Sequence, residues 1–117
     1  MTKIVFYKHR GAFYGFRETG HAGFAAAGDD ILCSAISAMT MLVINTLEVA
    51  YAADVDYQID ERTTNITVTC KAALGTNDNE KQQYAAHGLL YGYYLQLNDM
   101  LEDYYDYLDV DVEERAV

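Results

Sequence analysis

The sequence of 117 residues contains no proline, and this absence bears on its domain organisation. A chain of this length and average composition would carry about six prolines. Without a proline-rich linker, an internal repeat or a low-complexity tract, the sequence shows no sign of a domain boundary. The length and the hydrophobic content of 51% suit one globular core. We therefore predict a single domain over residues 1–117.

Basic side chains are scarce as well. Eight Lys and Arg residues stand against 18 Asp and Glu residues, which gives a formal net charge of −10. Such a surface repels nucleic-acid phosphates and anionic lipids, so we expect neither nucleic acid nor a membrane as a partner. It attracts a basic protein, although the charge alone is equally explained by solubility. Seven acidic residues lie within positions 102–117, and we expect this end to be partly a solvated tail.

Cysteine and histidine are also few. Cys33 and Cys70 are the two cysteines, with no CxxC pair, and the start of the chain lacks the apolar segment of a signal peptide. We therefore expect a cytoplasmic protein with two free thiols. Three histidines without paired spacing predict no metal site, and no cofactor is expected.

The uncharged run Ile31–Leu47 has 17 residues, five of them with polar side chains. A membrane span needs about 20 predominantly apolar residues, so the run is interpreted as a buried core helix. Its apolar residues lie on nearly all sides. We therefore expect it to pack on a sheet and also against another helix or subunit.

The pattern of apolar residues predicts four strands and two helices. The strands form two hairpins, and the helices are capped by Asp30 and by Asn77 or Asn79. The predicted strands are Lys3–His9, Phe13–Thr19, Val55–Asp60 and Asn65–Lys71. The first predicted helix runs from Ile31 to about Tyr51, and the second runs from the Asn77 or Asn79 cap to about Tyr107. The order ββαββα indicates an α+β fold (an α/β sandwich) in which two helices cover one mixed or antiparallel sheet. A short strand near Val110–Val112 is possible.

Residues Thr19–Ser37 hold the candidate chemistry. With Asp30 as N-cap, Cys33 is the third residue of the helix, where the helix dipole favours a thiolate. Free first-turn N–H groups, those of Leu32 and Cys33, could then hold an oxyanion.

His21 lies twelve residues before Cys33, across a glycine-rich loop, and a Cys–His pair is the minimum for thiolate catalysis. Ser37 shares the helix face of Cys33. Asp29 or Asp30 is a candidate third member that orients His21. By residue type alone, a buried structural cysteine and a surface histidine are the more frequent case. An acidic binding module that docks on a basic protein, or a purely structural acidic protein, would then explain the chain.

Two motifs add to this reasoning: GHAG at residues 20–23, and GDDILCSAIS at residues 28–37, where a long helix begins. Together they resemble the ribosomal-processing cysteine protease (Prp) family. The resemblance implies a cytoplasmic homodimer that removes a short N-terminal extension from a large-subunit ribosomal protein, cutting after an aromatic residue. It implies His21 as base and Cys33 as nucleophile.

The same resemblance makes Asp30 and Ser37 supporting residues, and Gly20 and Gly23 the residues that shape the loop. The loop Ala22–Asp29 would cover the site until a peptide displaces it. Residues Phe24–Ala27 are less polar than the family pattern, which leaves the preferred substrate sequence open.

Overall fold

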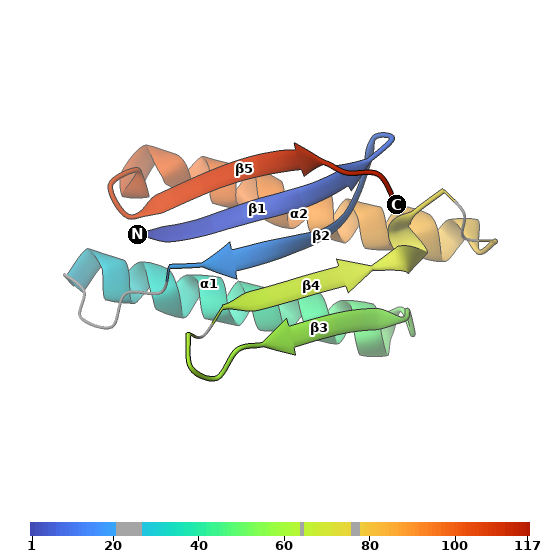
Figure 1. Ribbon diagram of the computed structural model, residues 1–117, viewed down its shortest axis with the longest axis horizontal. Coiled ribbons are helices and arrows are strands. Elements are labelled where there is room, and N and C mark those ends of the chain that lie inside the picture. Colours follow the sequence, from blue (N-terminus) through green and yellow to red (C-terminus); the bar gives the residue numbers. More distant parts are fainter. Residues whose placement is uncertain (21–26, 64, 76–77) are drawn as a thin grey trace.

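The chain forms two layers, a five-stranded sheet and a pair of long helices (Figure 1). The computed structural model describes residues 1–20, 27–63, 65–75 and 78–117, with side chains in the first helix described from Ile31 onward. In chain order the elements are β1 (Thr2–His9), β2 (Ala12–Thr19), α1 (Ala27–Asn45), a π-helical turn η1 (Thr46–Ala50), β3 (Val55–Ile59), β4 (Ile66–Cys70), a 3-10 turn η2 (Lys71–Ala73), α2 (Glu80–Tyr104) and β5 (Leu108–Glu114). The predicted α+β class is confirmed, with a fifth strand added.

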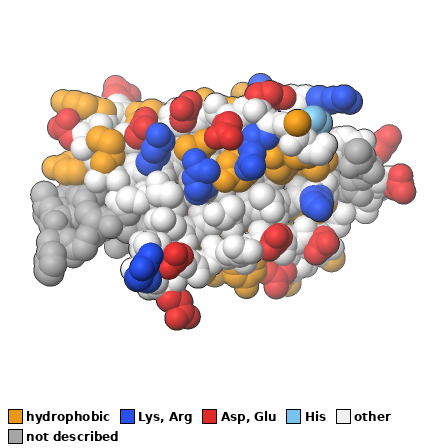
Figure 2. All heavy atoms as spheres, in the orientation of Figure 1, with side chains coloured by type: hydrophobic (Ala, Val, Ile, Leu, Met, Phe, Trp, Pro, Cys, Tyr) orange, Lys and Arg blue, Asp and Glu red, His pale blue; other side chains and the backbone are white. Residues whose placement is uncertain are grey.

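The sheet is mixed. Its strand order is β3-β4-β2-β1-β5, with β1 and β5 parallel and the other neighbours antiparallel. Both helices lie behind the same face of the sheet (Figure 1). The other face is open, and Figure 2 shows basic side chains near its middle with acidic ones around them. One such pair is Lys3 with Asp109, whose charged atoms are 4.0 Å apart.

The core lies between the sheet and the helices. Alternate residues of each strand point toward the helices, as the period of a strand requires. Phe6 of β1 is fully buried and packs against the rings of four residues, Phe13, Phe16, Tyr93 and Tyr94. Cys70 is also fully buried, which confirms its predicted place in the core.

The acidic C-terminal end differs from the prediction. Residues Leu108–Glu114 form β5, paired with β1 from Thr2 to Lys8, instead of a tail with a short strand. The alternation explains the difference. Leu108, Val110 and Val112 pack with the core, while the acidic residues between them are exposed to solvent. An exposed carboxylate at every second position is compatible with an edge strand that is half buried.

Helix α1 begins at Ala27, one turn earlier than predicted. Asp30 is therefore its fourth residue, and the prediction of Asp30 as N-cap is wrong. Alanine has the highest helix propensity of all residues, and carboxylates are favourable throughout the first turn of a helix. Both effects allow the helix to start ahead of the two aspartates.

The outer side of α1 is not covered within one chain. Leu32, Ile36 and Leu47 are fully buried, whereas Leu42 is 60% and Val49 76% exposed. By length and apolar composition alone, Ile31–Ala50 could cross a membrane, although one third of it is buried in the protein. Core helices share these two properties, and the packing of α1 on the sheet supports that prediction.

Candidate functional site

Cys33 lies on α1 at the end of the molecule where β1 begins (Figure 1). Its thiol forms no disulfide and is half-buried, and its Sγ is 3.8 Å from the hydroxyl oxygen of Thr2. Leu32 beside it is fully buried, while Ser34 is exposed. The thiol therefore lies at the boundary between the core and solvent, as a reactive cysteine requires.

The start of α1 changes the environment of this thiol. Cys33 is the seventh residue of the helix, so it lies in the second turn and not in the first. Only the first-turn N–H groups of a helix lack intrahelical acceptors. The N–H groups of Leu32 and Cys33 have carbonyl acceptors four residues earlier, which removes the reason for assigning them to an oxyanion hole.

Thr2 is a contact of the site that sequence reasoning missed. Its side chain is fully buried, its backbone N–H donates to the carbonyl of Tyr107 at 2.8 Å, and it pairs with Leu108 of β5. Thr2 therefore lies on the helix-facing side of β1 with Ile4 and Phe6. The alternation of β1 could have placed Thr2 on this face, but no local pattern connects it with Cys33.

Gly20 follows the last residue of β2, Thr19, and directly precedes His21. Its φ is +81°, and a Cβ there would overlap the carbonyl oxygen of Met1. Only glycine fits such a conformation and contact without strain. Met1 and Thr2 thus touch Gly20 and Cys33 respectively, so the start of β1 contacts one residue of each motif.

The other predicted site residues are placed only in part. His21 and Gly23 lie outside the described residues, as do the side chains of Asp29 and Asp30, so the His21–Cys33 pair stays a prediction. Ser37 lies one turn beyond Cys33 on α1, with an exposed side chain.

A buried polar network crosses the core farther along α1. Thr40 donates to the Oε2 atom of Glu18 at 3.2 Å, and its hydroxyl lies 2.9 Å from that of Tyr93. Glu18 and Thr40 are almost completely buried. Burial raises the pKa of Tyr93 far above its ordinary range, and the hydrogen bond with Thr40 opposes this rise in part. The network ties β2, α1 and α2 together.

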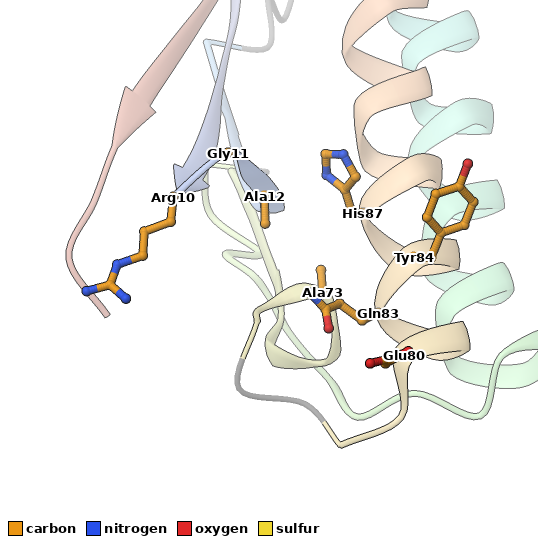
Figure 3. Close-up of a pocket in the computed structure, with 8 residues that line it drawn as sticks. All are labelled: Arg10, Gly11, Ala12, Ala73, Glu80, Gln83, Tyr84 and His87. Carbon is orange, nitrogen blue, oxygen red and sulfur yellow. The ribbon is translucent and has the colours of Figure 1, made fainter.

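The other end of β1 has a cavity of about 470 Å³ (Figure 3). It lies between the β1–β2 turn and the start of α2, roughly 25 Å from Thr2, the length of an eight-residue strand. His87 points toward that turn, and its Nδ1 accepts a hydrogen bond from the N–H of Phe13 at 2.9 Å. His87 also stacks on Tyr91 at 5.8 Å, so its contacts are those of a packing residue. Among the side chains that the structure describes, no three His, Cys, Asp or Glu residues are grouped as metal ligands.

Solved structures share this fold over almost the whole chain. SMU.848 from Streptococcus mutans is 23% identical, with 98% of this chain and 99% of that one covered and a TM-score of 0.79. The ribosomal processing protease Prp from S. aureus in complex with a substrate peptide is 18% identical, with 98% and 100% covered and a TM-score of 0.75. The same protease with a covalently linked product peptide is 19% identical, with 97% and 100% covered and a TM-score of 0.76.

At these identities the structural matches establish the fold and not the activity. No curated protein sequence matches the chain significantly. The family model described as cysteine protease Prp matches residues 1–109, which include both motifs and every element up to the start of β5. The chain therefore belongs to the cysteine protease Prp family.

Proposed function

We propose that this cysteine protease removes a short N-terminal extension from a large-subunit ribosomal protein, with Cys33 as nucleophile and His21 as base. The observation that carries the proposal is the half-buried Cys33 thiol, which forms no disulfide and lies beside the start of β1, where Gly20 leads into His21. Family membership supports the chemistry. The S. aureus Prp in the matched structures is a ribosomal processing protease, which supports the substrate class.

The chemistry follows from a paired thiol and imidazole. His21 takes the proton of the Cys33 thiol, and the thiolate attacks the scissile carbonyl to form a tetrahedral oxyanion. The oxyanion collapses to a thioester while His21 protonates the departing amine. Water then hydrolyses the thioester and frees Cys33. Asp30 and Ser37 are proposed to support the pair, and Gly20 and Gly23 to shape the loop that carries His21.

The charge of the protein supports a basic substrate. A net charge of −10 attracts a ribosomal protein that is rich in lysine and arginine. Added salt screens this attraction, so kcat/KM should fall as ionic strength rises while kcat stays unchanged. Since such a substrate is made in the cytoplasm, we propose that compartment for the enzyme.

The direct test uses a large-subunit ribosomal protein with its N-terminal extension, incubated with the enzyme and weighed by mass spectrometry. We expect wild type to release the extension after an aromatic residue, and Cys33→Ser and His21→Ala to lose cleavage by at least about a thousandfold. Cys70→Ala, which changes the other thiol, is the matched control and should cleave normally.

Two results would contradict the proposal. One is cleavage by Cys33→Ser at the wild-type rate. The other is tight binding of the ribosomal protein by the wild type without cleavage, which is what the alternative binding module predicts.

We also infer a homodimer, formed through the outer side of the two helices. A groove of about 300 Å³ runs between them, lined by Met39, Leu42 and Val43 of α1 and by Gly88, Leu89, Gly92, Tyr93 and Gln96 of α2. A Cβ at Gly88 or at Gly92 would have no neighbour within 4 Å, so the backbone of α2 is open to close approach there. Leu42 in the groove and Leu95 beside it are both exposed. This apolar surface fits a second copy of the chain.

Sedimentation velocity tests the dimer. We expect a dimer for wild type and a monomer for Leu42→Glu, because a carboxylate at this position would be buried in the interface. Tyr84→Glu changes an exposed residue on α2 outside the groove and should remain dimeric. A monomeric wild type at micromolar concentration would contradict the inference.

A further inference from the structure

We propose that Thr2 is a positioning residue for the nucleophile: its hydroxyl donates to the Cys33 thiolate and holds the sulfur in place. The proposal rests on the proposed function, in which Cys33 is the nucleophile. It assigns a role to the first residue of β1, which lies outside both motifs.

Of the two residues in the contact, Thr2 is buried and Cys33 is half-buried. The hydroxyl oxygen of Thr2 is 3.8 Å from the Cys33 Sγ, within the range of hydrogen bonds to sulfur. Thr2 is 0% exposed, so water does not compete for its hydroxyl. Buried hydroxyls in proteins are hydrogen-bonded, and a donor beside a thiol favours the ionised form.

The backbone of Thr2 is held on both sides. Its N–H donates to Tyr107, and it pairs with Leu108 on one side of β1, while the neighbouring Lys3 pairs with Thr19 of β2 on the other. A β-branched side chain on such a strand has few accessible rotamers. The hydroxyl is therefore held beside the sulfur by the paired start of β1, with little freedom to move away.

The start of α1 explains why the thiolate needs this donor. Cys33 is in the second turn of the helix, whereas the stabilising effect of the helix dipole is confined to the first turn. The N–H groups around Cys33 are occupied by the helix itself. A hydroxyl from outside the helix therefore supplies a hydrogen bond that the helix cannot supply.

Variants that differ only at Thr2 keep the charged and titratable groups of the neighbouring elements. On β1, Lys3 faces the opposite side of the sheet and pairs with Asp109 of β5. On β2, Glu18 shares the face of Thr2 and accepts from Thr40 of α1. Since a substitution at Thr2 changes none of these groups, a comparison of variants isolates the hydroxyl.

The test is the rate of Cys33 alkylation by iodoacetamide between pH 5.5 and 10, in a Cys70→Ala background with a single thiol. Thr2→Val keeps the shape of the side chain but removes its hydroxyl. We expect it to slow alkylation roughly three- to tenfold at pH 7, with an unchanged rate at the alkaline plateau. Thr2→Ser keeps the hydroxyl and should follow the wild-type curve at every pH.

Activity on the extended ribosomal protein is the second readout. Thr2→Val should lower kcat at pH 7 by a similar factor and leave KM unchanged, and higher pH should restore kcat. If Thr2→Val unfolds, as judged by thermal melting, Thr2→Ala serves as the variant without a hydroxyl.

Two outcomes would overturn the proposal: a hydroxyl-free variant with the wild-type alkylation curve, or a Thr2→Ser curve displaced as far as that of Thr2→Val. The alkylation curve does not depend on proteolysis. Failure of the proposed function would appear separately, as cleavage that survives Cys33→Ser.

Discussion

At the residue scale, buried hydroxyl groups carry the polar contacts between α1 and the sheet. Thr2 contacts Cys33, and seven residues further along α1 Thr40 contacts both Glu18 and Tyr93. A carboxylate in a core is tolerated only with hydrogen-bond donors around it. Among the contacts described above, the hydrogen bond from Thr40 is therefore the one on which the burial of Glu18 depends most directly.

Thr40→Val tests this dependence. The substitution keeps the shape of the side chain and removes a donor to Glu18, so we expect it to lower the free energy of unfolding by about 1–3 kcal/mol. Thr40→Ser keeps the hydroxyl and should cost less. Urea denaturation followed by circular dichroism measures both values. A Thr40→Val protein as stable as wild type would show that the hydroxyl contributes nothing.

The two residues of the Thr2–Cys33 contact differ in how far the sequence could predict them. Cys33 stands in a recognisable motif at the start of an apolar helix, so its prediction as nucleophile needed only the local sequence. Its partner Thr2 is 31 residues away on another element. The contact exists because the first part of α1 lies at the end of the sheet where β1 begins (Figure 1), and no periodicity in the sequence encodes that packing.

At the scale of elements, the start of α2 is set by a local side chain. Asn79 is the N-cap, and its side chain accepts a hydrogen bond from the N–H of Gln82 at 3.1 Å. Of the two predicted caps, Asn77 and Asn79, the second is therefore confirmed. Asn79→Ala should lower the free energy of unfolding by about 1 kcal/mol, since a first-turn N–H loses its acceptor. Asp78→Ala changes the exposed residue before it and is the control. Equal stability losses in urea titrations of both variants would contradict the role of Asn79 as a cap.

The same scale shows where sequence reasoning succeeds and where it fails. The four predicted strands are confirmed to within one residue at each end, because their segments are rich in β-branched and aromatic residues. The N-cap preference of Asp30 predicts a start of α1 one turn later than Ala27, because it leaves out the helix propensity of the alanine before it. The acidic residues of the C-terminal end predict a partly solvated tail with only a short strand near Val110–Val112, whereas the alternation of Leu108, Val110 and Val112 extends β5 to seven residues. Its parallel partner β1 lies at the other end of the chain.

At the scale of the whole molecule, burial of ionisable groups limits stability in alkali. Burial raises the pKa of the Cys70 thiol, and backbone hydrogen bonds from Ala72 and Ala73 oppose the rise in part. When the folded pKa is above the unfolded one, the unfolded chain releases its proton first. Stability is then level below the unfolded pKa and falls as pH increases above it.

We therefore expect the free energy of unfolding to decline above about pH 8.5, the ordinary range of a thiol, by at most about 1.4 kcal/mol per pH unit from Cys70. Tyr93, whose pKa is also raised by burial, adds to the decline above about pH 10. Urea denaturation at a series of pH values from 7 to 10 measures the free energy of unfolding. In Cys70→Ala the first part of the decline should disappear; an unchanged decline would assign it to other groups.

The whole molecule also explains how the two ends of the chain contribute to one site. β1 lies between β2, which leads into His21, and β5, whose pairing anchors Thr2 beneath Cys33. The acidic C-terminal strand is thus part of the support of the site, which its composition alone did not indicate. The S. aureus protease Prp, which shares this fold, is known in complex with a substrate peptide and with a covalently linked product peptide.

The central claim is that Cys33 is the nucleophile, and covalent trapping tests it most directly. A short peptide chloromethyl ketone with phenylalanine at the reactive end is incubated with the enzyme at neutral pH, and the modified residue is located by tandem mass spectrometry. We expect one label per chain, on Cys33, with the buried Cys70 unmodified. A label on Cys70, or an intact Cys33 after full loss of activity, would contradict the account.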